Sequence, residues 1–336
     1  MSILLLFSMS KNNRVLYILP LAVLTFSDAV AALVGTHYGK KIFKIAKNTK
    51  SWEGTAAFSG ITFILMILFL YGLTSLTWPA LLLIAATFSI LGALIEAVSW
   101  NGLDNIFIPM SAYLFLNAFL HQEEFQLFFQ FISLLGLSFL GLIAGPKSRL
   151  NTHALMVAII ALYFFCVVGG TAWVIAPVLV FLSHIALVKI YKDEHNYTLD
   201  SVLSVFSGGF FWILMEKVFQ LPYGLFFFAF SLAIHLQIIV LLRLKELNGE
   251  KANSKTILLT SLLSSGMVLI TTWIYFDINR QLLILTAFAI LLMFIGGIIF
   301  SINAERFSQK RWLAEAALAI SGSILGLIPF YIMESI

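Results

Sequence analysis

The first 120 residues of the chain contain four carboxylates, and their type and positions suggest chemistry. They are Asp28, Glu53, Glu96 and Asp104. A run of lysines lies among them, and its members are Lys40, Lys41, Lys44, Lys47 and Lys50. Carboxylates in an otherwise acid-free apolar segment need cations nearby. The sequence offers two candidates, which are a bound divalent metal ion and these lysines.

The elements that position these residues are predicted to be membrane helices. Apolar residues make up 61% of the 336 positions and charged residues only 11%, against about a quarter in soluble domains. Apolar runs of about 20 residues can cross a bilayer as helices. The runs are 15–35, 55–77, 79–99, 105–120, 125–145, 153–169, 172–190, 201–220, 223–242, 257–276, 281–302 and 312–333. Alternating strand patterns are absent, so we predict an all-α polytopic transmembrane bundle of about 11–12 helices.

The basic residues predict which side of the membrane each loop faces. Alternate loops hold 16 of the 20 lysines and arginines, beginning with the loop at residues 40–50. Because cytoplasmic loops carry the Lys/Arg excess, this first loop is predicted to be cytoplasmic and both termini to lie outside. All four carboxylates then fall at or near the cytoplasmic ends of the first four helices. The net charge of +4 is interpreted as this topology signal and not as nucleic-acid binding.

Each carboxylate also has a structural interpretation. Asp104 could N-cap the fourth helix, Glu53 could occupy the first turn of the second, and Glu96 could reach the interface from a helix end. Lys41, Lys44 and Lys47 are interpreted as topology signals only. Asp28 is harder to explain this way, because a carboxylate inside a membrane helix costs several kcal/mol unless it is paired.

Small residues share a helix face with Asp28. Asp28, Ala32, Gly35 and Gly39 follow one another at steps of four, three and four, which keeps them on one side of a helix. Small side chains there let another backbone approach closely, so Asp28 is predicted to face a helix interface. Gly35 and Gly39 would also suit a helix end at which a phosphate approaches backbone N–H groups.

The motif residues form a set of pieces in a fixed order and spacing. The pieces are Ser27-Asp28-Ala29, Val34-Gly35-Thr36-His37-Tyr38-Gly39-Lys40, Thr49-Lys50-Ser51-Trp52-Glu53-Gly54-Thr55, Glu96 and Asp104-Asn105. This set resembles the dolichol/phytol kinase family of CTP-dependent polyprenol kinases, which is related to the phosphatidate cytidylyltransferases. The resemblance covers about residues 15–120. Relatives usually carry several helices before this motif and this chain carries one, so either the chain is truncated or its later helices complete the bundle.

The resemblance implies a kinase that uses CTP and Mg²⁺ to phosphorylate a lipid alcohol such as dolichol, a polyprenol or phytol. It implies catalytic roles for Asp28, Asp104 and Lys50, and Mg²⁺ binding by Asp28, Glu53, Glu96 and Asp104. Glu53 and Glu96 could instead orient the lysines. The nucleotide would be bound by Gly35, His37, Gly39, Lys40, Lys50, Glu53 and Asn105. The motif loop, residues 35–53, would lie on the cytoplasmic side.

The sequence leaves other readings open. Residues 1–145 are predicted to form the kinase-like membrane domain, and residues 146–336 an additional helical region of unknown role. Short matches between 58–66 and 206–215 suggest a decayed repeat. The alternatives to a kinase are a cytidylyltransferase-like enzyme, whose C-terminal signature is missing, and a transporter or flippase in which Asp28 and Glu96 bind a coupling ion. The sequence selects neither the alcohol nor the oligomeric state.

Overall fold

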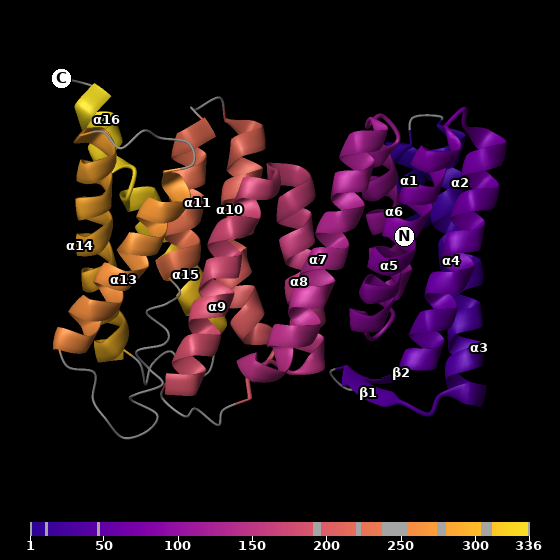
Figure 1. Cartoon of the computed structure of the whole chain (residues 1–336), viewed down its shortest axis with the longest axis horizontal. Helices are drawn as coiled ribbons and strands as arrows, with labels where there is room; N and C mark the ends of the chain where they lie inside the picture. The colour runs from indigo at the N-terminus through magenta and orange to yellow at the C-terminus, as the bar shows by residue number, and fades with distance from the viewer. Residues whose placement is uncertain are drawn as a thin grey trace. The chain divides into compact units, whose positions relative to one another are not determined.

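The computed structural model describes residues 2–10, 13–45, 48–190, 196–219, 223–236, 254–273, 280–303 and 311–334. The regular elements among them are helices and one two-stranded hairpin, joined by short loops (Figure 1). The chain divides into two compact units. Unit 1 comprises Met1–Leu142 and Leu155–Tyr163, and unit 2 comprises Ile143–Ala154 and Phe164–Ile336. The functional roles predicted for residues 1–145 and 146–336 stay predictions.

Unit 1 contains the motif residues. Its elements are α1 (Ser2–Met9), α2 (Arg14–Ala22), the π-helical turn η1 (Val23–Ser27), α3 (Asp28–Tyr38), β1 (Ile42–Ile45), β2 (Asn48–Ser51), α4 (Trp52–Leu73), α5 (Trp78–Val98) and α6 (Asp104–Phe119). Helices α7 (Glu124–Ser148) and α8 (Thr152–Gly169) contribute residues to both units.

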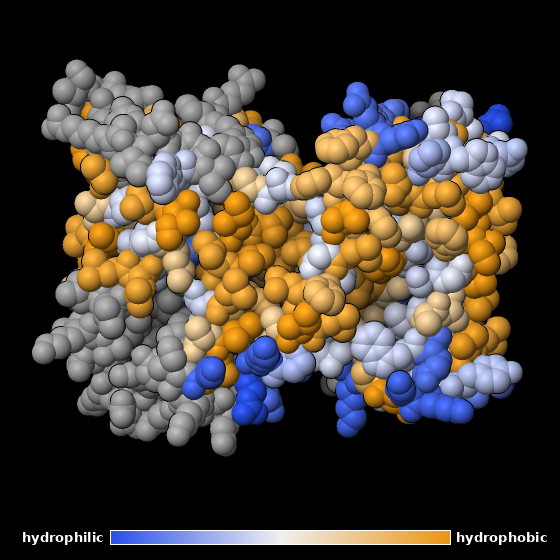
Figure 2. All heavy atoms as spheres, in the orientation of Figure 1, coloured by the Kyte–Doolittle hydropathy of each residue, from blue (hydrophilic) through white to orange (hydrophobic). Residues whose placement is uncertain are grey.

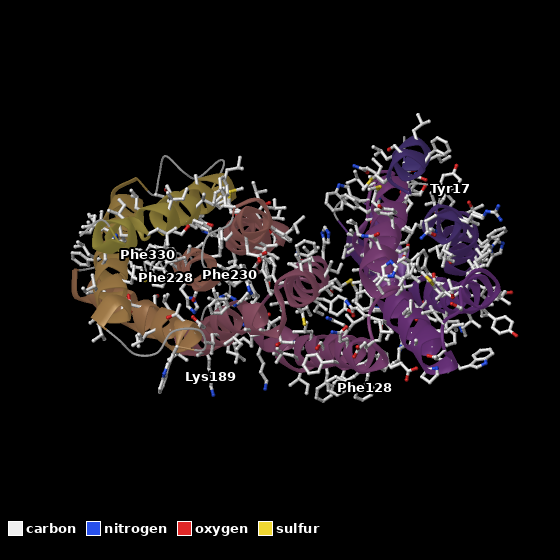
Figure 3. The ribbon with its side chains drawn as sticks, turned by 90° about the horizontal axis from the view of Figure 1, so that it is seen from above. Tyr17, Phe128, Lys189, Phe228, Phe230 and Phe330 are labelled. Carbon is white, nitrogen blue, oxygen red and sulfur yellow. The ribbon has the colours of Figure 1, made fainter. Side chains whose placement is uncertain are left out.

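Unit 2 is built around one largely apolar helix. Its elements are the 3₁₀ turn η2 (Thr171–Val174), α9 (Ile175–Ile190), α10 (Leu199–Val218), α11 (Tyr223–Leu236), α13 (Ser254–Thr272), α14 (Arg280–Asn303), α15 (Arg311–Leu325) and α16 (Ile328–Glu334). Helix α11 contacts α9, α10, α13 and α15. Phe228 and Phe230 are fully buried on it and lie inside the ring of helices in Figure 3. Apart from the buried Ser231 and His235, α11 is largely apolar, as expected for a helix at the centre of such a bundle.

The predicted helical membrane class is confirmed. Six helical stretches in the described part of the chain are long and apolar enough to cross a membrane, namely Arg14–Tyr38, Trp52–Leu73, Trp78–Val98, Glu124–Ser148, Thr152–Gly169 and Leu199–Glu216. Five shorter apolar helices follow the same pattern at Thr171–Ala186, Gly224–Leu236, Leu262–Thr272, Leu283–Gly296 and Glu315–Phe330. In unit 1, apolar side chains form a broad band with hydrophilic ones gathered at its ends (Figure 2). The total of 11–12 spans stays a prediction.

Several residues used to predict the topology lie outside the described residues. Lys47 is one of them, and most basic residues of the later loops fall within 191–195, 237–253 and 304–310. The apolar run at 223–242 is described only as far as residue 236. The side of the membrane on which the first loop lies therefore stays a prediction.

The hairpin between α3 and α4 departs from the expectation that strand patterns are absent. Strands β1 and β2 pair antiparallel, with Phe43 opposite Lys50 and Lys44 opposite Thr49. Phe43 and Ile45 are buried in a cluster with Ala97, Val98 and Met156. Two four-residue strands give only two alternations of polar and apolar residues, which is too few to stand out in a basic loop. The hairpin packs its apolar side against α5 and α8.

The first membrane segment changes its helical period just before Asp28. The π-helical turn η1 follows Pro20, which has no N–H for the helical ladder. Such π-turns are frequent at functional sites. After it, α3 begins with Asp28. The buried hydroxyl of Thr62 on α4 donates a hydrogen bond to Ser27 Oγ at 2.9 Å, so the turn is fastened to α4 immediately beside Asp28.

The predicted close approach of two helix backbones is confirmed at the glycines of α3 and α4. A Cβ atom at Gly54 would lie 2.9 Å from the Ala31 carbonyl oxygen and 3.2 Å from Gly35 Cα. A Cβ atom at Gly39 would lie 2.9 Å from the Ser51 side chain. One residue of the predicted face is corrected: Ala32 is exposed and Ala31 is buried instead, because α4 crosses α3 over Ala31 and Gly35.

This crossing gives a prediction about stability. Gly54→Ala is expected to lower the free energy of unfolding by about 1–3 kcal/mol, because the added methyl group would push two backbones apart. Gly60→Ala on the same helix meets nothing within 4 Å and is expected to be neutral or stabilising by up to about 1 kcal/mol. Thermal unfolding of the two variants in one detergent compares them, and equal midpoints would contradict the close approach.

Candidate active site

Lys50 and Glu96 form an ion pair inside unit 1. Lys50 Nζ lies 2.5 Å from Glu96 Oε1 and also donates a hydrogen bond to the Glu96 backbone oxygen. The two side chains are only 16% and 9% exposed. A lysine ammonium carries three N–H donors, so two are used by Glu96 and one remains available to a ligand.

The hairpin explains why Lys50 points inward. Lys50 is the cross-strand partner of Phe43, so both side chains lie on the same face of the hairpin, the face that packs against α5. Lys44 is one position out of phase with Phe43, and its side chain is exposed. The alternation of strand residues therefore separates one buried lysine from the lysines around it.

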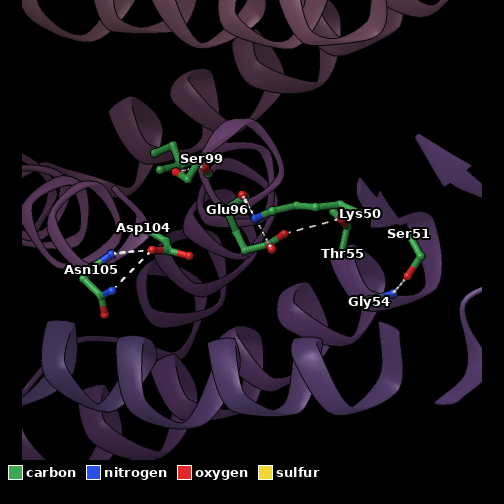
Figure 4. A network of polar contacts seen from close by, with 9 residues as sticks. Lys50, Ser51, Gly54, Thr55, Glu96, Ser99, Asp104 and Asn105 are labelled. Carbon is green, nitrogen blue, oxygen red and sulfur yellow. Dashed lines mark hydrogen bonds and ion pairs between the residues drawn. The ribbon is translucent and has the colours of Figure 1, made fainter. Parts of the chain in front are cut away.

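Thr55 completes the contacts of Glu96 (Figure 4). Its hydroxyl donates to Glu96 Oε2 at 3.4 Å and is buried. Thr55 lies in the first turns of α4, where the side chain of Ser51 caps the helix by accepting the Gly54 N–H at 3.1 Å. The start of α4 thus presents Lys50 and Thr55 to the two oxygens of one carboxylate.

Asp104 is placed by the turn that joins α5 to α6. Asn101 and Gly102 have left-handed backbones with φ of 52° and 80°, which glycine and asparagine tolerate best. Leu103 occupies the N-cap position, so Asp104 does not cap α6 and lies in its first turn. Asp104 Oδ1 accepts the Asn105 backbone N–H at 3.0 Å and the Asn105 side-chain N–H at 3.4 Å. Asn105 therefore orients the Asp104 carboxylate.

Electrostatic interactions join Asp28 to these groups. Asp28 is half-buried, and its carboxylate is repelled by Asp104 and attracted by Lys50. Glu96 is attracted by Lys50 and repelled by Asp28. We call Asp28, Lys50, Glu96 and Asp104 the acid–lysine cluster. The cluster contains three carboxylates and one ammonium group, so a bound cation would bring its net charge closer to zero.

Glu53 makes its hydrogen bonds outside the acid–lysine cluster. Both of its carboxylate oxygens accept the backbone N–H of Lys41 at 3.2 Å. Its predicted place in the first turn of α4 is confirmed. Glu53 therefore fastens the start of the hairpin to the start of α4.

The remaining predicted nucleotide residues lie at the end of α3. The ring of His37 is exposed, and its Nδ1 lies 3.0 Å from the Leu33 carbonyl oxygen of its own helix. Gly35 and Gly39 pack against Ser51. This helix end is a C-terminus, which presents carbonyl oxygens and the negative end of the helix dipole, so the phosphate cradle of N–H groups expected there is not formed by α3. Lys40 is exposed just beyond it.

The acid–lysine cluster contains carboxylates that could serve as ligands of a magnesium ion. Within the described ranges, no group of three His, Cys, Asp or Glu side chains is placed to hold a metal ion unaided. Mg²⁺ in nucleotide sites is usually held by one or two carboxylates, with substrate phosphates and waters completing the octahedron. Asp28 and Asp104, whose carboxylates repel each other, supply that number of carboxylates, whereas Glu96 and Glu53 are engaged by Lys50 and by the Lys41 backbone.

Two polar residues of this region had no predicted role. Thr55 ends the sequence motif, and its sequence signal is a hydroxyl five residues after Lys50, in the first turn of α4. Thr62 has a weaker signal, since a threonine in an apolar helix usually bonds its own backbone. Its bond to Ser27 depends on how α3 and α4 cross, which the sequence does not specify.

The fold and the acid–lysine cluster define a class: a multi-pass helical membrane protein with a site of carboxylates and lysine built on its first helices. Comparison with known proteins is more specific. Over 93 residues the chain is 32% identical to a phytol kinase of Synechocystis sp. (strain ATCC 27184 / PCC 6803 / Kazusa). The matched segment is 27% of this chain, and it spans only 38% of that kinase. The resemblance to the polyprenol kinase family is thereby confirmed as a distant, partial one.

Two other comparisons gave no match. No protein-family model matches the chain, and no solved structure matches it.

Proposed function

We propose that this protein is a membrane-embedded kinase that transfers the terminal phosphate of CTP to a lipid alcohol at the cytoplasmic face. The observation that carries the proposal is the acid–lysine cluster, formed by the motif residues through which the chain resembles polyprenol kinases. The similarity to phytol kinase supports a kinase with a nucleotide donor and a lipid substrate. CTP, Mg²⁺, the alcohol and the cytoplasmic face are parts of the proposal.

Phosphoryl transfer requires positioning and charge neutralisation more than covalent chemistry from the protein. The free N–H of Lys50 would bind a phosphate oxygen while its other two donors stay on Glu96. Lys40, exposed at the end of α3, would bind the phosphates from the solvent side. Asp28 and Asp104 would hold Mg²⁺, which neutralises phosphate charge when bound.

The reaction needs one proton acceptor. The alcohol oxygen attacks the terminal phosphorus, the bond from phosphorus to the bridging oxygen of CDP breaks, and the hydroxyl proton leaves. Asp28 or Asp104 would accept this proton, since both carboxylates belong to the cluster and neither is paired as closely as Glu96. The products are CDP and the lipid phosphate.

Glu96 and Glu53 receive positioning roles in this account. Glu96 holds Lys50, and Thr55 holds Glu96. Glu53 fixes the hairpin that carries Lys50. Asn105 would orient Asp104, and contacts of the nucleotide with His37, Gly35 and Gly39 stay predictions.

The purified full chain tests the proposal directly. With Mg²⁺, it is expected to phosphorylate at least one of dolichol, a polyprenol, phytol or diacylglycerol, and to prefer CTP to ATP, GTP and UTP. Thin-layer separation of the lipid products measures the transfer, and removal of Mg²⁺ with a chelator is expected to stop it. If none of these alcohols is phosphorylated with any of the four nucleotides, the kinase assignment fails.

A further inference from the structure

We propose that the outer face of the β1–β2 hairpin is a docking surface for anionic lipid headgroups. This outer face consists of exposed residues of the hairpin and exposed residues at the two helix ends that flank it. Its members are Tyr38, Lys41, Ile42, Lys44, Thr49 and Trp52.

The strand alternation gives the hairpin two chemically different faces. Phe43 and Ile45 point into the buried cluster with α5, and Lys50 shares their face. Ile42 and Lys44 point the other way and are exposed. The inner face therefore serves the acid–lysine cluster, and the outer face contributes no contact to it.

The outer face is unusually apolar for a surface that would meet only water. Ile42 is 65% exposed, Tyr38 is 71% exposed and Trp52 is 43% exposed. Tyr38 ends α3 and Trp52 begins α4, so both stand at the ends of predicted membrane spans. The Trp52 backbone N–H donates to the Lys41 carbonyl oxygen at 3.0 Å, and this hydrogen bond keeps the start of β1 beside the start of α4. Aromatic side chains concentrate at the headgroup level of membranes.

The charge of the outer face is compensated only in part, because the Glu53 carboxylate attracts Lys41. The sequence has no acidic residue between Asp28 and Glu53, and the Glu53 carboxylate accepts the Lys41 backbone N–H. The Lys50–Glu96 ion pair lies on the inner side of the hairpin and involves neither Lys41 nor Lys44. Lys41 and Lys44 therefore present positive charge beside exposed apolar groups. Anionic headgroups match this combination, and each lysine near such a surface strengthens binding about five-fold.

Nucleotide phosphates are a weaker fit to this surface than lipid phosphates. A soluble nucleotide would bind the lysines but leave Ile42, Tyr38 and Trp52 in water. Of the two lysines proposed for the nucleotide, Lys50 lies on the opposite face, and Lys40 is not a member of the outer face. The inference concerns a surface outside the proposed kinase site, and its test does not require kinase activity.

A fluorescent label on the outer face can test this inference in the full chain. The one cysteine, Cys166, is buried, so Cys166→Ala with Thr49→Cys gives a single labelling site that leaves both lysines and Ile42 in place. The protein is placed in nanodiscs of phosphatidylcholine with increasing phosphatidylglycerol. The emission of an environment-sensitive dye is expected to shift to the blue as phosphatidylglycerol rises.

Two matched lysine variants test whether the charge of the outer face causes the emission shift. Lys44→Ser is expected to raise the phosphatidylglycerol fraction at half-maximal shift about five-fold. Lys147→Ser, at the exposed end of α7, is expected to leave it unchanged. Thermal unfolding checks that each variant is folded. Three results would overturn the proposal. They are an emission that does not change with phosphatidylglycerol, an equal response of both variants, and a shift that CTP causes and the lipid does not.

Discussion

Asp28→Asn is expected to reduce phosphate transfer by at least about a hundred-fold and to leave the helical fold intact. The amide keeps the size of the carboxylate but loses the charge that would hold Mg²⁺ and the oxygen that could accept a proton. Asp28 is repelled by Asp104, so removing its charge relieves an unfavourable interaction. The free energy of unfolding is therefore expected to stay the same or to rise.

Initial rates with CTP and an accepted alcohol, measured beside thermal unfolding, separate these two effects. Glu124→Gln is a matched control, because Glu124 also lies in the first turn of a helix but bonds to Thr77 outside the acid–lysine cluster. An Asp28→Asn protein with wild-type rates would mean that the carboxylate is structural. The proposal for a metal site at Asp28 and Asp104 would then fail.

Lys50→Met is expected to lower both stability and nucleotide binding. Methionine removes the ammonium group and leaves Glu96 as an unpaired carboxylate that is 9% exposed, which costs about 3–5 kcal/mol. The double variant Lys50→Met with Glu96→Gln is expected to recover most of this loss, because neither partner is then charged. Transfer activity is expected to stay low in both, since no ammonium group reaches the phosphate.

The four proteins of this double-mutant cycle can be compared by thermal unfolding and by the concentration of CTP that gives half-maximal rate. Lys44→Met serves as the control on the outer face of the hairpin and is expected to change stability by less than about 0.5 kcal/mol. If the double variant is as unstable as Lys50→Met alone, Lys50 does not act on stability through Glu96. If Lys50→Met keeps wild-type activity, the phosphate role of Lys50 is wrong.

Much of the fold could be predicted because membrane helices leave a strong local signal. In the described residues, each apolar run of the sequence falls mainly on helix, with a few non-helical residues at run ends and at the turn 326–327. The glycine face of α3 was predictable for the same reason, since helical spacing alone brings Asp28 and Gly35 to one side. The spacing did not distinguish Ala31 from Ala32, because both lie within reach of that face and the crossing of α4 decides between them.

The pairing of Lys50 with Glu96 was not predictable from the sequence. The two residues lie 46 positions apart, and their contact depends on a hairpin whose strands are four residues long. From the sequence, Glu96 could therefore be either a metal ligand or a group that orients a lysine, and no residue pattern decided between the two roles. In the structure its carboxylate is occupied by Lys50 and Thr55, which favours the orienting role. The π-turn before Asp28 is likewise a product of packing that has no local sequence signal beyond Pro20.

The position of the transferred phosphorus tests the central claim most directly. The purified protein is incubated with Mg²⁺, an accepted lipid alcohol and CTP labelled at either the γ- or the α-phosphate. The account predicts that γ-label enters the lipid in stoichiometric step with release of CDP, and that α-label stays in CDP. Entry of α-label into the lipid with release of pyrophosphate would instead show cytidylyl transfer, and an unlabelled lipid in both reactions would contradict the account altogether.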